Sequence, residues 1–189
     1  MSQDYSPSLV TKSLVFCGDA AMKSAAGPAT LLYDKVNDNN GTMYNGTCFD
    51  FDGTDDLVLT SDPVITGTGD FTITAWINRA TVNTYDFICG NYGSGNAGGL
   101  EFYGNNNGTT GLYIGSYLIT SATMTADTWY HVVATRESGA AKIYINGVLD
   151  VSGTLANSIT GSLDFAIGNA PNFTSENFDG KIADVKAFN

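Results

Sequence analysis

An all-β fold built from two packed antiparallel sheets is what this sequence predicts, and three observations support the prediction. Short apolar runs recur along nearly the whole chain, Gly, Asn, Asp or Pro stands in nearly every gap between them, and no helical periodicity extends beyond about two turns. Alternating apolar and polar residues suit a strand with one face on a core. About a dozen short strands at close spacing indicate a two-sheet β-sandwich.

The expected strands follow one another at short intervals. They are Ser13–Gly18, Thr47–Phe51, Leu57–Thr60, Phe71–Arg79, Tyr85–Gly90, Gly99–Tyr103, Gly111–Gly115, Tyr117–Ser121, Thr128–Glu137, Ala141–Asn146, Leu163–Gly168 and Lys181–Phe188. Short helices are expected only near Ala20–Ala26 and around Thr123–Asp127. In the strand Phe71–Arg79, the odd-numbered apolar residues should share one face of the sheet.

The segment from Trp129 to Gly147 is the clearest structural signal in the chain. Two alternating apolar stretches flank a short turn at Glu137–Ala140 and stop at Asn146-Gly147, a dipeptide that favours positive φ and reverses a strand. This segment predicts a β-hairpin followed by a second reversal.

Length and charge limit the classes of protein to consider. The 189 residues predict one domain over residues 13–189, after an extended arm at 1–12 that contains Pro7 and lacks periodicity. The net charge is −11 with only eight Lys and Arg, so we expect no nucleic-acid partner. Cys17, Cys48 and Cys89 are expected to be buried free thiols, with a Cys17–Cys48 bridge left open.

No stretch reaches the length of about 20 apolar residues that spans a bilayer, and the first residues lack the basic and apolar regions of a signal peptide. We therefore expect no membrane insertion. A protein made in the cytoplasm without a signal peptide would stay there, or leave by a specialised exporter or by cell lysis.

Several short motifs resemble those of one fold family. A Trp-x-His-Val strand begins at Trp129, and the strand that follows it carries Tyr-x-Asn-Gly from Tyr144. The other motifs are a Phe-Asp-Gly-x-Asp-Asp turn at Phe51, a Phe-Thr-x-x-Ala-Trp strand at Phe71 and a closing Gly-x-Ile-x-Asp-Val strand at Gly180. These motifs resemble the laminin-G-like, concanavalin-A-like family of jelly rolls over roughly Leu14 to Phe188. The resemblance implies a jelly-roll fold and a carbohydrate- or surface-recognition module.

The resemblance extends to phage structural proteins, through the opening segment Leu14–Ser24. It implies a virion component that recognises a polysaccharide or cell-surface glycan and contacts other virion proteins, and copies of the chain could form a homo-oligomer. Lysis would release such a protein without a signal peptide. The alternatives are a purely structural capsid-stabilising protein, such as a decoration protein or fibre knob, and a polysaccharide-degrading enzyme of the glucanase or alginate-lyase jelly-roll type.

An enzyme is the least favoured of these functions. Retaining glycosidases need two carboxyl groups about 5–5.5 Å apart, normally at close spacing on one strand face. Glu101 has no acidic residue at such a spacing, Glu137 stands at a turn, and Glu176 is alone in a polar loop. The lone His131 has no nucleophile motif to work with and is interpreted as structural. We therefore expect no catalytic residues.

Candidate sugar contacts are aromatic, amide and carboxylate side chains, because rings pack on the apolar face of a pyranose while planar polar groups bind its hydroxyls. They concentrate between Tyr85 and Tyr117 and in the loop at Asn169–Asn177. The candidates are Tyr85, Asp86, Asn91, Tyr92, Tyr103, Asn105, Tyr113, Tyr117, Asn172 and Phe173.

A structural calcium ion is the one cofactor considered. The segment from Asp34 to Thr42 resembles an oxygen-rich loop of the family, although Val36 and Asp38 replace its usual Ser and Gly. Calcium takes six to eight oxygen ligands, so partners from distant strands would be needed. The candidate ligands are Asp19, Asp34, Asp38, Asn39 and Asp184, and the alternative is an Asx-turn without metal.

Overall fold

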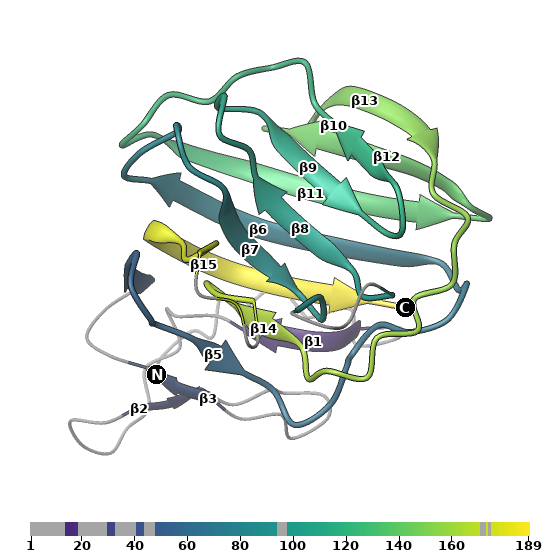
Figure 1. The fold of residues 1–189 in the computed structure, drawn as a ribbon, viewed down its shortest axis with the longest axis horizontal. Helices are drawn as coiled ribbons and strands as arrows, with labels where there is room; N and C mark the ends of the chain where they lie inside the picture. Colours follow the sequence, from purple (N-terminus) through teal and green to yellow (C-terminus); the bar gives the residue numbers. More distant parts are fainter. Residues whose placement is uncertain are drawn as a thin grey trace, which may run out of the picture.

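A computed structural model gives the fold as two antiparallel sheets packed face to face. It describes residues 48–93, 98–170, 173 and 175–189, together with the backbone of Leu14–Gly18, Thr30–Leu32 and Gly41–Met43. In Figure 1 the strands between Asp86 and Ile119 cross in front of the strands Phe71–Arg79, Trp129–Glu137 and Asp179–Phe188, which form the layer behind them. The all-β sandwich expected from the sequence is confirmed.

The large sheet has seven strands among the residues described, in the order β1-β15-β6-β11-β12-β13, with β4 also paired to β15. Its strands are β1 (Leu14–Gly18), β4 (Phe49–Asp52), β6 (Phe71–Arg79), β11 (Trp129–Glu137), β12 (Ala140–Ile145), β13 (Val148–Thr154) and β15 (Asp179–Phe188). Strand β6 pairs with both β11 and β15, so segments far apart in sequence form the centre of this sheet.

The small sheet has six strands in the described residues, in the order β10-β9-β8-β7-β14-β5. Its strands are β5 (Val58–Leu59), β7 (Asp86–Gly90), β8 (Glu101–Gly104), β9 (Thr110–Tyr113), β10 (Tyr117–Ile119) and β14 (Ala166–Ile167). A separate pair is formed by β2 (Thr30–Leu32) and β3 (Gly41–Met43). Strands β7 to β10 form an antiparallel meander that carries most of the predicted sugar contacts.

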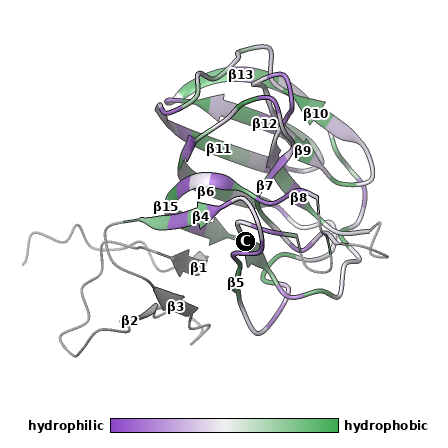
Figure 2. Ribbon diagram, turned by 60° about the vertical axis from the view of Figure 1, so that its left-hand side comes forward, coloured by the Kyte–Doolittle hydropathy of each residue, from purple (hydrophilic) through white to green (hydrophobic). Residues whose placement is uncertain are grey.

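The core lies between the sheets and follows from the alternation along the strands. In β6, Phe71, Ile73, Ala75 and Ile77 are all buried, as predicted, whereas Trp76 is exposed. They pack against side chains of the small sheet, among them Phe102, Leu112 and Ile167. Figure 2 shows the resulting alternation of hydrophobic and hydrophilic residues along the strands.

Both predicted reversals around β12 are present. Ser138 and Gly139 have φ of 50° and 81°, and Asn146 and Gly147 have φ of 51° and 80°. Positive φ at both central residues matches the right-handed twist of the strands that such a turn joins. His131 N also donates a hydrogen bond to Asn146 Oδ1 (2.9 Å), which ties the second turn to β11.

Other expectations need correction. The helix expected around Thr123–Asp127 does not form: Met124 N donates to Gly108 O (2.7 Å) and Thr125 N to the Tyr130 hydroxyl (3.0 Å), so tertiary hydrogen bonds replace helical ones. The sequence interpretation also missed β13, an edge strand whose residues are largely exposed or half-buried. The helix expected near Ala20–Ala26 and the arm at 1–12 lie outside the described residues.

Cys48 and Cys89 are free thiols; Cys89 is buried as expected, whereas Cys48 is only half-buried, and the side chain of Cys17 lies outside the described residues. Because Cys48 is free, it does not form a bridge to Cys17. Among the residues that the structure describes, no helix is long and apolar enough to cross a membrane.

Candidate functional site

The outer face of the small sheet carries the candidate site, and strand alternation determines which side chains reach it. In β8, Phe102 points into the core, so its neighbours Glu101 and Tyr103 point to the opposite face. Glu101 pairs across the sheet with Tyr113, and Tyr103 pairs with Gly111. A Cβ at Gly111 would lie 2.3 Å from Tyr103 Cζ, so the tyrosine ring lies directly over the glycine.

Six aromatic rings form a continuous chain on this part of the molecule, which we call the tyrosine surface. The ring centroids lie 6.4 Å apart for Tyr85 and Tyr103, 6.3 Å for Tyr103 and Tyr117, 4.7 Å for Tyr113 and Tyr117, 5.3 Å for Tyr92 and Tyr113, and 5.6 Å for Tyr92 and Phe173. Offset and edge-to-face rings at such distances stabilise one another. The surface therefore unites all six aromatic residues that the sequence suggested as sugar contacts.

The segment that follows β14 docks against β7 and completes this surface. Phe87 and Ala166 point away from the main core into a second small cluster, where Ala170 covers them and Tyr92 and Phe173 pack at its edge. Phe87 N donates a hydrogen bond to Glu176 O (2.8 Å). This backbone contact fixes Glu176 beside the sheet, although the residue is remote from β7 and β8 in sequence.

A pocket of about 390 Å³ opens within the tyrosine surface. Its lining residues are Tyr85, Glu101, Tyr103, Asn105, Tyr117, Ile119 and Glu176. Tyr117 is 65% exposed and Tyr85 47% exposed, whereas Tyr103 is buried beneath them. The pocket thus combines exposed aromatic faces with carboxyl and amide groups, which is a common composition of small-ligand sites.

Two carboxyl groups meet in this pocket. A side-chain hydrogen bond joins Glu101 to Glu176, and burial together with the nearby Glu176 charge raises the pKa of Glu101 to about 9. Glu176 Oε2 is buried and accepts no hydrogen bond from an N–H or hydroxyl group of the described residues. At neutral pH a proton therefore remains on Glu101, because a charged Glu101 would be buried away from water and repelled by the neighbouring Glu176.

Glu101 and Glu176 are acidic partners of each other, so the expectation that each lacks one is wrong. Strand spacing indicates only neighbours on the same strand, whereas Glu176 comes from the loop between β14 and β15. An acidic residue in an otherwise aromatic and apolar strand was the one local signal for Glu101. Nothing in the sequence around Glu176 indicated its position, since the contact depends on how the loop docks.

The remaining sugar-contact candidates take different positions. Asp86 is 1% exposed and pairs with Arg79, and Asn91 is fully buried, where it accepts a hydrogen bond from Leu100 N (2.8 Å) and donates one to Ile65 O (3.1 Å). Both side chains are therefore buried structural residues of the domain and do not reach a ligand. Asn105 lines the pocket, and Asn172 lies outside the described residues.

The calcium candidates are only partly described. Asp19, Asp34, Asp38 and Asn39 lie outside the described residues, and Asp184 stands on β15 with φ of 51°, paired with Lys186. Within the described part of the chain, the carboxylates close enough to share an ion are instead those of three exposed residues, Asp52, Asp55 and Asp56. Calcium binding therefore stays a prediction from the sequence.

Thermal unfolding with and without a chelator tests that prediction. Calcium at a hundred times its Kd would stabilise the fold by about 2.7 kcal/mol. In a domain of this length each kcal/mol shifts Tm by roughly 2–4 °C. We expect a chelator to lower Tm by several degrees and added calcium to restore it, with magnesium as the control. An unchanged Tm would contradict the prediction of a structural calcium ion.

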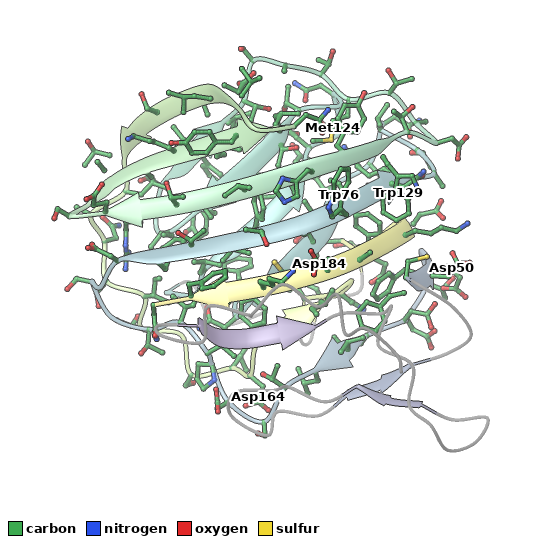
Figure 3. The ribbon with its side chains drawn as sticks, turned by 180° about the vertical axis from the view of Figure 1, so that it is seen from behind. Asp50, Trp76, Met124, Trp129, Asp164 and Asp184 are labelled. Atoms are coloured by element: carbon green, nitrogen blue, oxygen red, sulfur yellow. The ribbon has the colours of Figure 1, made fainter. Side chains whose placement is uncertain are left out.

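A second exposed aromatic group lies on the outer face of the large sheet. Trp76 and Trp129 are 41% and 40% exposed, and the Trp76 ring centroid lies 5.1 Å from that of His131. Figure 3 shows the two tryptophans close together, with Asp184 further along the same face. Burial lowers the pKa of His131, and the ring packs on the sheet as the sequence interpretation expected.

The chain belongs to the laminin G family of concanavalin A-like lectins and glucanases. The model of this family, described as the concanavalin A-like lectin/glucanases superfamily, matches residues 52–189. This membership agrees with the observed jelly-roll sandwich and with the motifs seen in the sequence. Among curated protein sequences, none matches this chain.

Three solved structures illustrate the fold similarity. The Trypanosoma rangeli sialidase aligns at a TM-score of 0.63 and 14% identity, covering 93% of this chain and 30% of the sialidase. Domain 4 of an extracellular arabinanase from Geobacillus stearothermophilus, in complex with arabinotriose, aligns at 0.55 and 19% identity over 91% of this chain and 80% of that one. A carbohydrate-binding module of a Ruminococcus gnavus sialidase, bound to sialyllactose, aligns at 0.55 and 18% over 65% and 75%. Such identities show a shared lectin-like fold, and this chain spans less than a third of the length of the Trypanosoma enzyme.

Proposed function

We propose that this protein is a non-catalytic glycan-binding module and that the tyrosine surface is its binding site. The observation that supports the proposal is the chain of six aromatic rings around a pocket with carboxyl and amide groups. Aromatic faces desolvate the apolar face of a sugar ring, and the polar groups then orient its hydroxyls.

The arrangement of the surface suits a ligand longer than one sugar. The rings extend from Tyr85, through the pocket, to Phe173 beside β7. Each ring is held by its neighbours, so little conformational freedom is lost when a ligand stacks on it. The arabinotriose and sialyllactose complexes of structurally similar domains support a glycan partner for this fold.

The pairing of Glu101 and Glu176 supports binding rather than hydrolysis. A retaining glycosidase places its two carboxyl groups about 5–5.5 Å apart and an inverting enzyme about 6.5–9.5 Å apart, which leaves room for the reacting carbon or a water. Carboxyl groups that are hydrogen-bonded to each other leave no such room. We therefore propose that the pair contacts ligand without turnover. Release of reducing ends from laminarin, alginate or capsular polysaccharide would contradict this.

The setting that we propose is the surface of a virion, where the module would bind host glycans, with calcium as a structural ion. This part of the proposal rests on the likeness of the sequence to phage structural proteins. A capsid-stabilising role is the alternative. It predicts tight binding to particles that lack the protein, with no affinity for glycans.

Substitution of Tyr117 tests the site. Tyr117 contacts both Tyr103 and Tyr113 and is largely exposed, so Tyr117→Ala removes ring area from the centre of the tyrosine surface with little effect on folding. Central aromatic residues of binding sites typically contribute 2 kcal/mol or more, which corresponds to a loss of roughly 30-fold in affinity. We expect that loss for the best ligand found on a glycan array, measured by calorimetry.

Trp129→Ala is the matched control, since Trp129 is a comparably exposed aromatic residue on the opposite sheet. It should bind as the wild type does. Loss of binding in Trp129→Ala with retention in Tyr117→Ala would move the site to the large sheet and refute the proposal. No array signal at high protein concentration would refute glycan binding altogether.

A further inference from the structure

We propose that the tyrosine-lined pocket selects glycans that carry an ammonium group, with Glu101 and Glu176 as the counter-charges. The inference rests on the proposed function and names the class of ligand. Its basis is a pocket in which the buried Glu101 and the buried Oε2 of the half-buried Glu176 lie beside aromatic faces, with no Lys, Arg or His among its lining residues.

The acid pair has no cationic partner in the described residues. The ion pairs found there are Arg79–Asp86 and Lys186–Asp184, and neither involves Glu101 or Glu176. Glu101 is only 7% exposed, yet it lines the pocket, and Glu176 Oε2 is buried without an N–H or hydroxyl donor. Buried carboxylates are normally paired with a cation or bound to a metal. Any ammonium group supplies the positive charge, and the protonated amine of an amino sugar also supplies the missing N–H donors.

The aromatic rings favour the same kind of ligand. Tyr85, Tyr103 and Tyr117 line the pocket together with the two carboxyl groups. The faces of aromatic rings attract cations, and aromatic cages of this kind recognise alkylated ammonium groups. A neutral sugar would gain the stacking but not the charge interaction. The net charge of −11 would also attract a cationic polysaccharide from a distance.

The protonation of Glu101 links binding to a measurable exchange. Because burial and Glu176 raise the pKa of Glu101 to about 9, the empty pocket holds a proton at pH 7. The titratable groups around the pair are Glu176, from the loop, and the tyrosines of the meander, whose pKa values are also raised at Tyr92, Tyr103 and Tyr117. Among the described residues, no Lys, Arg or His shifts the pKa of Glu101. An ammonium group that enters should therefore displace close to one proton.

A divalent metal ion is the competing occupant. Calcium requires six to eight oxygen ligands, and the polar lining of the pocket consists of two carboxyl groups, one amide and three phenol groups, on rings that present carbon faces. This lining supplies few strong oxygen ligands and much aromatic surface. It therefore favours an organic cation.

Calorimetry with matched charged and neutral probes tests the inference on the full chain. The pairs are choline with its neutral carbon isostere, and glucosamine with N-acetylglucosamine. We expect the charged member of each pair to bind at least tenfold more tightly. Titrations in buffers of different ionisation enthalpy at pH 7 should show nearly one proton released per ligand. Glu101→Gln should abolish both the preference and the proton release, and Glu137→Gln, at the exposed last residue of β11, should change neither.

The outcomes distinguish the inference from the proposed function. Equal affinity for charged and neutral probes, with glycan binding still dependent on Tyr117, would overturn the inference and leave the function standing. Choline binding without any glycan binding would refute both the function and the inference, because the inference names a glycan as the ligand. If calcium chloride alone bound in a manner lost in Glu101→Gln, the pocket would be a metal site and the inference would be wrong.

Discussion

Arg79→Met should lower the free energy of unfolding by about 3–5 kcal/mol, the usual cost of removing one partner of a buried ion pair. Arg79 Nε donates to Asp86 Oδ2 (2.6 Å), and Nη2 donates to Thr84 O (2.9 Å) and Asn105 O (3.1 Å). Both charged side chains are almost completely buried. Without Arg79, Asp86 would lose its counter-charge and the donor to its Oδ2, keeping only the Thr84 hydroxyl on Oδ1 (2.7 Å), and two carbonyl groups would lose a donor. A fall in Tm of roughly 10 °C is expected by calorimetry.

The double variant Arg79→Met, Asp86→Leu provides the decisive comparison. Replacing both members of a buried ion pair by apolar residues is often nearly neutral, whereas removing one is not. The double variant should therefore recover much of the stability that the single variant loses. Lys181→Met, at an exposed position on β15, is the control and should change stability by less than about 0.5 kcal/mol. If Arg79→Met were no worse than this control, the ion pair would not stabilise the fold.

The same variant links stability to the site. Arg79 holds the backbone of Asn105, which lines the pocket, and Gly104 leaves room for the guanidinium group: a Cβ there would lie 2.6 Å from Arg79 Cζ. The loss of Arg79 should loosen the β8–β9 turn and weaken glycan binding as well. Asp86 was chosen from the sequence as a sugar contact because it is acidic and close to tyrosines. Sequence spacing does not indicate that Asp86 forms a buried ion pair with Arg79.

Patterns within a short stretch of sequence predicted the strands and turns that depend on interactions within that stretch. The alternation of β6 gave both its bounds and its buried face, and the Asn146-Gly147 turn was evident because few other dipeptides adopt positive φ twice. Strand β13 was missed because Asp150, Ser152 and Gly153 interrupt the apolar pattern of an edge strand. Asp150 in fact accepts hydrogen bonds from Ser121 N (2.6 Å) and Ala122 N (3.0 Å), a contact that only the folded chain brings about.

In the candidate site too, local features could be predicted from the sequence and contacts between remote segments could not. The sequence indicated that tyrosines concentrate between Tyr85 and Tyr117, and the meander does bring their rings together because antiparallel neighbours share a face. It did not indicate the acid pair. The position of Glu176 depends on how the loop after β14 packs on the sheet, with Ala170 of that loop against Phe87, and this is a tertiary contact. Pairing between remote segments cannot be read from spacing along the chain.

Glu101→Gln should make the protein more stable at neutral and alkaline pH. The pKa of Glu101 is raised from 4.5 to about 9 by burial and by Glu176. Between these values the folded protein keeps a proton that the unfolded chain has lost, so the free energy of unfolding falls as pH rises. The decline is at most about 1.4 kcal/mol per pH unit. The glutamine amide is neutral at every pH and can donate to Glu176, so the variant should lack this decline.

The measurement is Tm against pH from 4 to 9 for the wild type and the variant. The two curves should meet near pH 4, where Glu101 is protonated in both states, and should diverge steadily above pH 5, with the variant higher. Glu137→Gln makes the same chemical change at the exposed last residue of β11, and its curve should run parallel to that of the wild type. Parallel curves for Glu101→Gln would mean that the buried carboxyl group does not hold its proton. A divergent curve, together with lost preference for ammonium ligands, would show that the wild type sacrifices stability to keep an acid in its binding pocket, as functional sites often do.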